Sequence, residues 1–192
     1  MKAFDVILFL HIAVLLLAMV LTGLVLGSVW LAARAATVAE LRMTARPQRL
    51  GPLYALAILA LLGTGFSLLN MSKAPDKFDF GDPFVWTSAV VLLFLFLNGS
   101  LILGRHESAL RKALAVTPIG PVTPELRAMT IDPSLWFIEY INTFTVFGVV
   151  LNMATKPSLV WCVVHILAGA AIGAVIAWFG LTRAKTAVLS AV

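Results

Sequence analysis

The sequence predicts an all-α membrane protein, a polytopic helical bundle with five transmembrane helices in a single domain over residues 1–192. Composition is the first indication, because 61% of the residues are hydrophobic and only 12% are charged, against about 25% charged residues in soluble domains. The mean hydropathy of +1.01 agrees with this. The second indication is a set of apolar stretches close to the roughly 20 residues that a helix needs to cross a bilayer. These stretches are residues 6–33, 53–69, 84–103, 135–153 and 159–181.

The first stretch is predicted to be a retained membrane span. Its only ionisable side chain is His11, and it is followed by Arg34 and further basic residues. It is longer than the apolar core of about 7–15 residues in a cleaved signal peptide. Residues 32–45 are rich in Ala, Leu, Glu and Arg, which favour helix. We therefore expect the first helix to continue beyond the membrane until Pro47 stops it.

The third and fourth stretches begin with the same sequence pattern. Asp82 and Asp132 each precede a proline, and a tryptophan, Trp86 or Trp136, follows four residues after the aspartate. Aspartate is a preferred N-cap, proline suits the first helical turn, and tryptophan is enriched at membrane interfaces. We expect both aspartates to cap their helices and both tryptophans to lie at the interface.

The basic residues predict the orientation of the spans. An odd number of spans puts the termini on opposite sides of the membrane. With the N-terminus outside and the C-terminus cytoplasmic, the cytoplasmic side holds most of the 14 Lys and Arg residues, as the positive-inside rule requires. These cytoplasmic residues are Arg34, Arg42, Arg46, Arg49, Arg105, Arg111, Lys112, Arg127, Arg183 and Lys185, while Lys2, Lys73, Lys77 and Lys156 stay outside.

The same distribution indicates the location and the partners. We predict a multi-pass membrane protein, with the lipid bilayer as its first partner. The basic residues follow the span ends and do not form one clustered patch, so no nucleic-acid partner is predicted. The single cysteine, Cys162, excludes an internal disulfide and is predicted to be a small packing residue.

Two histidines lie at matching depths in the first and last spans. His11 and His165 both fall within about 10 Å of the outer boundary at a rise of about 1.5 Å per residue. A b-type heme with two histidine ligands would need this placement on two helices. The alternative is that each imidazole only hydrogen-bonds to a neighbouring group. Two histidines are too few for a tetrahedral metal site, so none is predicted.

A second set of polar residues lies toward the cytoplasmic side of the third and fourth spans. It consists of Asn98, Arg105, Glu139 and Asn142. Polar groups inside a span are costly and become functional candidates unless they find partners. We expect Glu139 to pair with Arg105, either as structural support or as part of a proton or ion path. His106 and Glu107, next to Arg105, are predicted to be solvated.

Small residues recur at the spacing that lets membrane helices pack closely. Gly23 and Gly27 lie on the first span, and Gly169 and Gly173 lie on the last. Their faces are predicted to pack inside the bundle or to form a homo-oligomer or a larger membrane complex.

Several short landmarks, taken in order, give the chain a resemblance to a known family. They are His11; Arg46, Leu50, Gly51 and Pro52; Gly63 and Gly65; Gly81, Asp82 and Pro83; Asp132 and Pro133; and Met153, Lys156 and Pro157. The chain resembles an uncharacterised family of bacterial integral membrane proteins related to the CopD and HemJ-like helical membrane proteins. The resemblance implies a compact helical bundle in a bacterial inner (plasma) membrane and, for HemJ-like members, a heme-associated redox role with a histidine in the first span. Of that pattern only His11 carries over, so a heme would recruit His165.

Three functions remain open from the sequence. The first is a redox-associated protein that binds b-type heme near the outer face. The second is a non-catalytic accessory or scaffold subunit, and the third is a small-solute or ion transporter built on Glu139 and Asn98. The sequence has none of the nucleotide-binding, zinc-protease or serine-hydrolase motifs of soluble enzymes, and no catalytic residue is identified.

Overall fold

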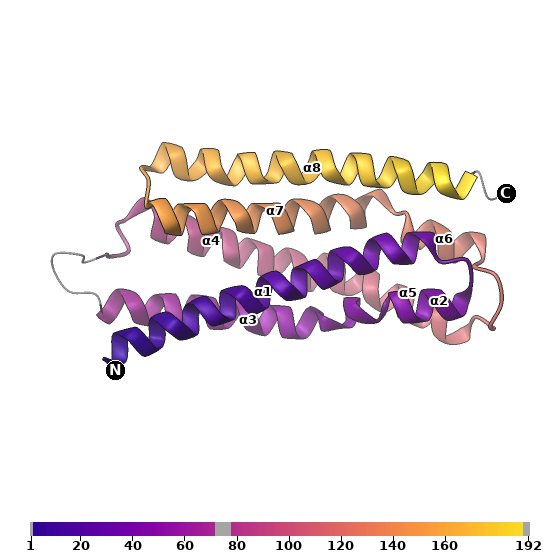
Figure 1. The fold of residues 1–192 in the computed structure, drawn as a ribbon, viewed down its shortest axis with the longest axis horizontal. Helices are drawn as coiled ribbons and strands as arrows, with labels where there is room; N and C mark the ends of the chain where they lie inside the picture. Colours follow the sequence, from indigo (N-terminus) through magenta and orange to yellow (C-terminus); the bar gives the residue numbers. More distant parts are fainter. Residues whose placement is uncertain (1, 72–77, 190–192) are drawn as a thin grey trace.

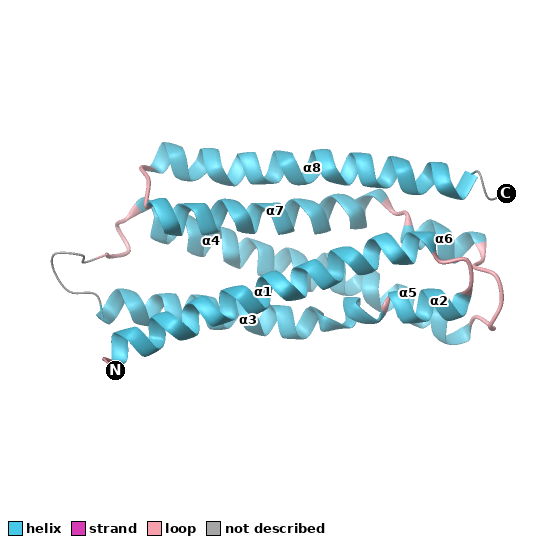
Figure 2. Ribbon diagram, in the orientation of Figure 1, coloured by secondary structure: helices cyan, strands magenta, loops and turns pink. Residues whose placement is uncertain are grey.

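Five membrane-length helical stretches lie side by side in an elongated bundle (Figure 1). The computed structural model describes residues 2–71 and 78–189, and every regular element in these ranges is a helix, as Figure 2 shows. This confirms the predicted all-α fold with five spans. Lys73 and Lys77 of the predicted outer loop lie outside the described residues.

The helices follow the predicted spans closely. Four of the five predicted spans lie within single helices, which are α1 (Ala3–Arg34), α3 (Gly51–Met71), α7 (Pro133–Thr155) and α8 (Leu159–Leu189). The third span is α4 (Pro83–Asn98) followed by a π-helical turn, η2 (Gly99–Leu103). The shorter elements are α2 (Val38–Thr44), η1 (Arg46–Leu50), α5 (Gly104–Val116) and α6 (Pro124–Thr130).

The predicted extension of the first helix to Pro47 is wrong, because α1 ends at Arg34. The chain turns there, and Thr37 caps the separate helix α2 by accepting a hydrogen bond from the Glu40 backbone N–H at 3.2 Å. The turn is also hydrogen-bonded to the segment that follows α5. The Val38 N–H donates to the carbonyl of Gly120 in that segment at 2.8 Å. Capping and tertiary pairing thus override the helix propensity of the Ala-rich segment.

Of the caps and interfacial tryptophans predicted for the starts of α4 and α7, only some are found. The Asp132 carboxylate accepts from the Ser134 N–H at 2.7 Å and caps α7 as predicted. The Asp82 carboxylate accepts from the Asp79 N–H instead, so it does not cap α4. Trp136 is wholly buried against Tyr140 and donates from Nε1 to the Thr130 carbonyl at 3.0 Å. Its predicted place at the interface is therefore wrong, because the indole N–H finds a partner inside the bundle.

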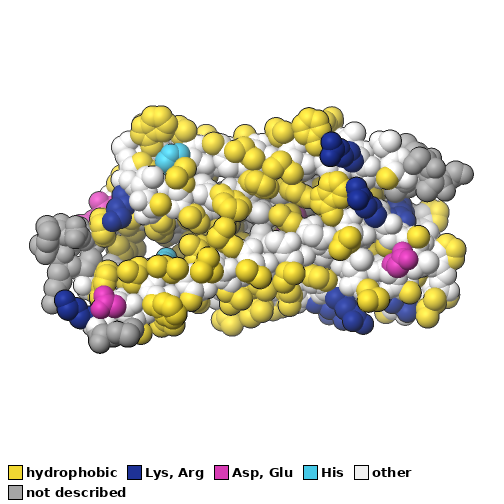
Figure 3. All heavy atoms as spheres, in the orientation of Figure 1, with side chains coloured by type: hydrophobic (Ala, Val, Ile, Leu, Met, Phe, Trp, Pro, Cys, Tyr) yellow, Lys and Arg dark blue, Asp and Glu magenta, His cyan; other side chains and the backbone are white. Residues whose placement is uncertain are grey.

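The outer surface of the bundle is that of a protein in lipid. Large apolar side chains such as Val160 and Trp178 are 71% and 62% exposed. Figure 3 shows hydrophobic side chains over the middle of the visible face and most Lys and Arg side chains toward one end. We call this end, where α1 ends and α3 begins, the basic end. A broad exposed apolar surface of this kind fits contact with a bilayer.

Candidate functional site

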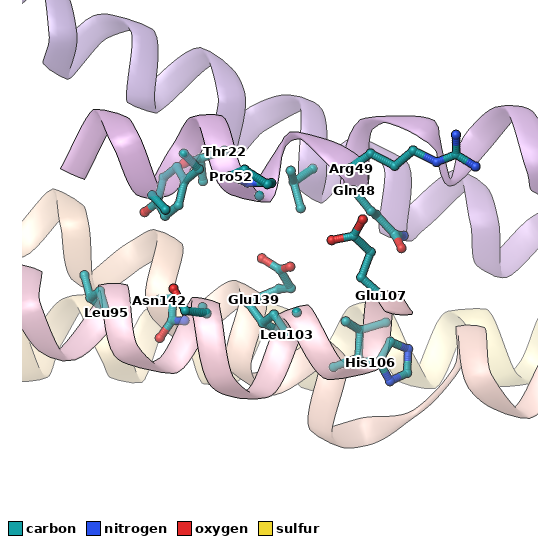
Figure 4. A pocket seen from close by; sticks show the side chains of 18 of the residues that line it. Thr22, Gln48, Arg49, Pro52, Leu95, Leu103, His106, Glu107, Glu139 and Asn142 are labelled. Carbon is teal, nitrogen blue, oxygen red and sulfur yellow. The ribbon is translucent and has the colours of Figure 1, made fainter. Parts of the chain in front are cut away.

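A cavity lies between the helices, in the half of the bundle near the basic end. Its volume is about 480 Å³, and it is walled by α1, η1 and α3 on one side and by α4, η2, α5 and α7 on the other (Figure 4). Its polar lining residues are Thr22, Gln48, Arg49, Tyr54, Ser100, His106, Glu107, Ser108, Arg111, Glu139, Asn142 and Thr143. A cavity with several charged side chains among membrane spans is a candidate binding site.

Glu139 projects into this cavity from α7. Figure 4 shows its carboxylate pointing across the gap toward the start of α3, with Asn142 one turn further along the same helix. The structure thus brings Glu139 and Asn142 of the predicted polar cluster to one site. Within residues 2–71 and 78–189, no hydrogen bond or ion pair of the Glu139 carboxylate is found.

The predicted pairing of Glu139 with Arg105 is not found. Arg105 is exposed to the outside of the bundle, and neither it nor Asn98 lines the cavity. The π-helical turn between Asn98 and Arg105 explains this, because it rotates α5 relative to the helical register that the sequence suggests. A regular α-helix would keep Asn98 and Arg105 near one stripe.

The prediction that Glu107 lies in solvent is also wrong. Glu107 is half-buried in the cavity wall, and its Oε2 atom would lie 3.6 Å from a Cβ placed on Gly51 at the start of α3. The positive end of a helix favours a carboxylate there. Arg49 and Arg111 interact electrostatically with the same carboxylate. His106 lines the cavity too, with its Nδ1 atom 4.0 Å from Asp132 Oδ2.

The π-helical turn η2 forms part of the cavity wall. Gly99, Ser100 and Leu103 of this turn line the cavity, and Gly104 follows at the start of α5. Single π-helical turns inside α-helices are frequent at functional sites, because they leave backbone groups outside the regular hydrogen-bond ladder. The sequence signal for this break is the pair of glycines, since no proline occurs in the span.

An apolar layer closes the bundle beyond the cavity. Ile58, Leu92 and Val149 come from α3, α4 and α7 and form a buried cluster. Tyr54 and Phe96 pack against this cluster and also line the cavity. The polar space therefore ends at apolar side chains in the middle of the bundle.

His11 forms a contact between α1 and α3. Its Nδ1 atom lies 2.8 Å from Thr64 Oγ1, whose single hydrogen is directed to the Ala60 carbonyl at 2.7 Å. The Thr64 oxygen is therefore placed to accept from the tautomer of His11 that carries its hydrogen on Nδ1. His11 also packs against Gly65, where an added Cβ would lie 3.5 Å from its Cε1 atom.

His165 forms a separate contact between α8 and α7. Its Nδ1 atom lies 2.8 Å from Asn152 Oδ1, and the Asn152 amide donates from Nδ2 to the Cys162 carbonyl at 3.1 Å. With the Asn152 oxygen as acceptor, the donor of this contact is His165 Nδ1–H. A hydrogen-bonded Nδ1–H is usual for a histidine that binds a metal through Nε2. Each histidine by itself fits the chemistry of a heme ligand.

The structure does not bring the two histidines to one site. α1 packs on α8 near the basic end, where Val29 and Ala33 share a cluster with Ala177. Figure 1 shows the two helices wide apart at the end that holds His11 and His165. In this arrangement the two histidines do not form one bis-histidine site. Among the described residues no group of three or more His, Cys, Asp or Glu side chains is placed to hold a metal ion.

The two pairs of predicted packing glycines differ in their surroundings. Gly169 and Gly173 are buried against α7, and a Cβ on Gly173 would lie 2.5 Å from the Tyr140 carbonyl oxygen. Gly148 on α7 makes an equally close approach to the His165 carbonyl oxygen. By contrast, Gly23 and Gly27 are exposed, with nothing within 4 Å of an added Cβ. Only the α8 pair therefore packs inside this chain.

Comparison with known proteins adds no assignment. No protein-family model, no curated protein and no solved structure matches this chain. The resemblance to the family related to the CopD and HemJ-like proteins stays a prediction from the sequence. The cavity and its charged side chains are therefore the features of this chain that point to a function.

Proposed function

We propose that this protein is a small-solute transporter of a bacterial inner membrane that binds the positively charged group of its solute at Glu139. One observation supports this most directly: the Glu139 carboxylate points into a cavity of about 480 Å³ and has no partner among the described residues. A charged side chain within a membrane helix is costly, and the cost on the insertion scale reaches about 2.5–3.5 kcal/mol at the helix centre. A carboxylate kept there without a partner is a functional candidate.

The cavity has further features of a transport site. Its wall contains the helix break at η2, and transporters often place their sites where membrane helices are interrupted. The site has access from the basic end, since Arg49 and Arg111 line the cavity and are exposed. The apolar cluster of Ile58, Leu92 and Val149 blocks the way to the other side. These features support a carrier in a state open toward one side of the membrane.

Flux into proteoliposomes tests this proposal. The two probes are guanidinium, which stays charged at neutral pH and crosses a bare bilayer slowly, and γ-aminobutyrate. We expect uptake of at least one probe by the wild type and loss of that uptake in Glu139→Gln. The matched control is Glu125→Gln, which changes an exposed glutamate outside the cavity. Uptake of both probes no faster than in empty liposomes would overturn the proposal.

The predicted orientation follows the positive-inside rule, which places the basic end and the cavity mouth in the cytoplasm. Cysteine labelling in intact cells tests it. In a Cys162→Ser background, a membrane-impermeant thiol reagent should label Lys2→Cys from outside and should label Glu125→Cys only after the cells are lysed. The reverse pattern would contradict the orientation.

A heme-associated redox role is the second candidate. The observation in its favour is that the Nδ1 atoms of both His11 and His165 lie 2.8 Å from a polar side chain of a neighbouring helix, the kind of contact that orients a histidine ligand. Absorption spectra of protein purified from heme-supplied cells test this role. A Soret band that is weakened or lost in His11→Ala or in His165→Ala would support it, and a colourless protein would exclude it.

A further inference from the structure

The charges that line the cavity are separated along its length. Glu139 lies inside the bundle on α7, whereas Glu107 and Arg49 lie toward the basic end (Figure 4). Arg111 lines the same cavity from α5. Arg49 and Arg111 are exposed at the rim. The cavity is thus lined by two carboxylates and two guanidinium groups, but these four groups are not paired one to one.

The rim has a surplus positive charge. Glu107 interacts electrostatically with both Arg49 and Arg111, so one carboxylate faces two guanidinium groups. Neither arginine makes a hydrogen bond or an ion pair with any residue of the described ranges. Arg42, which lies close by, is different, because its Nη2 atom already donates to the Leu114 and Thr117 carbonyls. Arg49 and Arg111 are therefore available to an anionic group.

The interior of the cavity has the opposite surplus. No Lys or Arg side chain accompanies Glu139 there. The other polar residues of α7 that line the cavity are the neutral Asn142 and Thr143, and the charged group that interacts electrostatically with Glu139 is a second carboxylate, Glu107. Unpaired opposite charges at the two ends of one cavity attract a ligand that carries both charges. A simple cation would meet the surplus positive charge at the rim, and a simple anion would meet Glu139 inside.

We infer that the ligand of this cavity is a small zwitterion whose ammonium group binds Glu139 and whose carboxylate or phosphate group binds Arg49 and Arg111. The inference rests on the proposed function and narrows its solute class. The cavity wall also contains apolar side chains, among them Leu95, Phe96 and Leu135. This favours a ligand with an aliphatic body between its two charges. The volume lies within the range of about 300–1,000 Å³ that is usual for small-molecule sites.

Binding measurements on the purified full-length chain test the inference. The probes are γ-aminobutyrate and ε-aminocaproate, each compared with its amine analogue, butylamine or hexylamine, and with its acid analogue, butyrate or hexanoate. For at least one chain length we expect the zwitterion to bind about tenfold more tightly than either analogue, which corresponds to about 1.4 kcal/mol. Isothermal titration calorimetry reports the affinities.

Two variants separate the two ends of the ligand. Glu139→Gln should abolish the advantage of the zwitterion over the acid analogue, and Arg111→Gln should abolish its advantage over the amine analogue. Lys112→Gln is the matched control, because Lys112 is exposed on the same helix and does not line the cavity. Glu139→Asp, which keeps the charge, should retain part of the affinity and so separates loss of binding from loss of folding.

The same chemistry occurs in free amino acids and in the headgroup of phosphatidylethanolamine. Competition between γ-aminobutyrate and nanodiscs that contain phosphatidylethanolamine would identify the lipid as the source. Binding unaffected by this lipid would identify a free solute. Amine analogues that bind as tightly as the zwitterions would overturn the inference while leaving flux at Glu139 intact. Absence of binding by every probe in a folded protein would overturn it as well.

Discussion

Asn152 and His165 join α7 to α8 inside the membrane region. Asn152 Oδ1 lies 2.8 Å from His165 Nδ1, and the Asn152 side chain is wholly buried. The same amide donates to the Cys162 carbonyl at 3.1 Å, so one side chain satisfies two groups of α8. The role of His165 in this fold is therefore to donate to a buried amide, which holds the ring orientation.

Replacement of Asn152 by leucine should destabilise the α7 and α8 pair. The change leaves the His165 Nδ1–H without its acceptor, and hydrogen bonds between membrane helices contribute about 1–2 kcal/mol in model peptides. We expect a lower midpoint of thermal unfolding in detergent. Asn98→Leu is the control, because Asn98 is half-buried at the end of α4, away from this contact. Equal midpoints for both variants would show that the Asn152 contact contributes nothing.

The spans were predictable from the sequence, but the contacts of the polar residues were not. Hydropathy identified five spans because the length of a membrane helix depends on the thickness of the bilayer. His11 and Glu139 stood out as polar residues in apolar stretches. Their partners did not, since Thr64 lies 53 residues from His11 in the chain and has no distinguishing pattern around it.

The sequence predicts some of the polar residues of the cavity but not its arginines. Glu139 and Asn142 are on its wall as part of the predicted polar cluster, yet Arg105 is replaced at the site by Arg49 and Arg111. The cause is the π-helical turn at Gly99–Leu103, which changes the face that α5 turns inward. Regular helical spacing cannot anticipate that rotation, although Gly99 and Gly104 mark where it occurs.

A glycine-to-leucine substitution should have a large effect on stability in the α8 glycine pair and none in the α1 pair. Gly173→Leu should separate α7 from α8, because even a Cβ would lie 2.5 Å from the Tyr140 carbonyl oxygen. We expect loss of the folded monomer or a strongly lowered unfolding midpoint. Gly27→Leu meets open space in this chain and should leave the midpoint unchanged. If the α1 face pairs with a second copy in the membrane, Gly27→Leu should reduce crosslinked dimer instead.

Arg127 should determine where α1 ends. Its guanidinium donates to the Ala33 carbonyl at 2.6 Å and also to the Ala35 carbonyl, so it satisfies backbone groups that the helix end leaves unpaired. Arg127→Gln should increase hydrogen exchange over residues 34–41 without changing exchange in α8. The control is Lys112→Gln, since Lys112 is exposed and far from this helix end in the chain. Unchanged exchange over residues 34–41 in Arg127→Gln would contradict the role of Arg127.

Neutralising Glu107 should shift the binding preference of the cavity toward anions. In the wild type this carboxylate offsets part of the charge of Arg49 and Arg111, and Glu107→Gln removes that offset. We expect the affinity for butyrate to rise several-fold, by an energy of about 1 kcal/mol that is typical of a partly exposed ion pair. The gain should shrink at high salt, because the two arginines are exposed and their charges are screened. Glu125→Gln, which changes the net charge of the protein equally but far from the rim, should leave butyrate binding unchanged. A gain of the same size in Glu125→Gln would assign the effect to net charge alone and would remove the rim arginines from the proposed site.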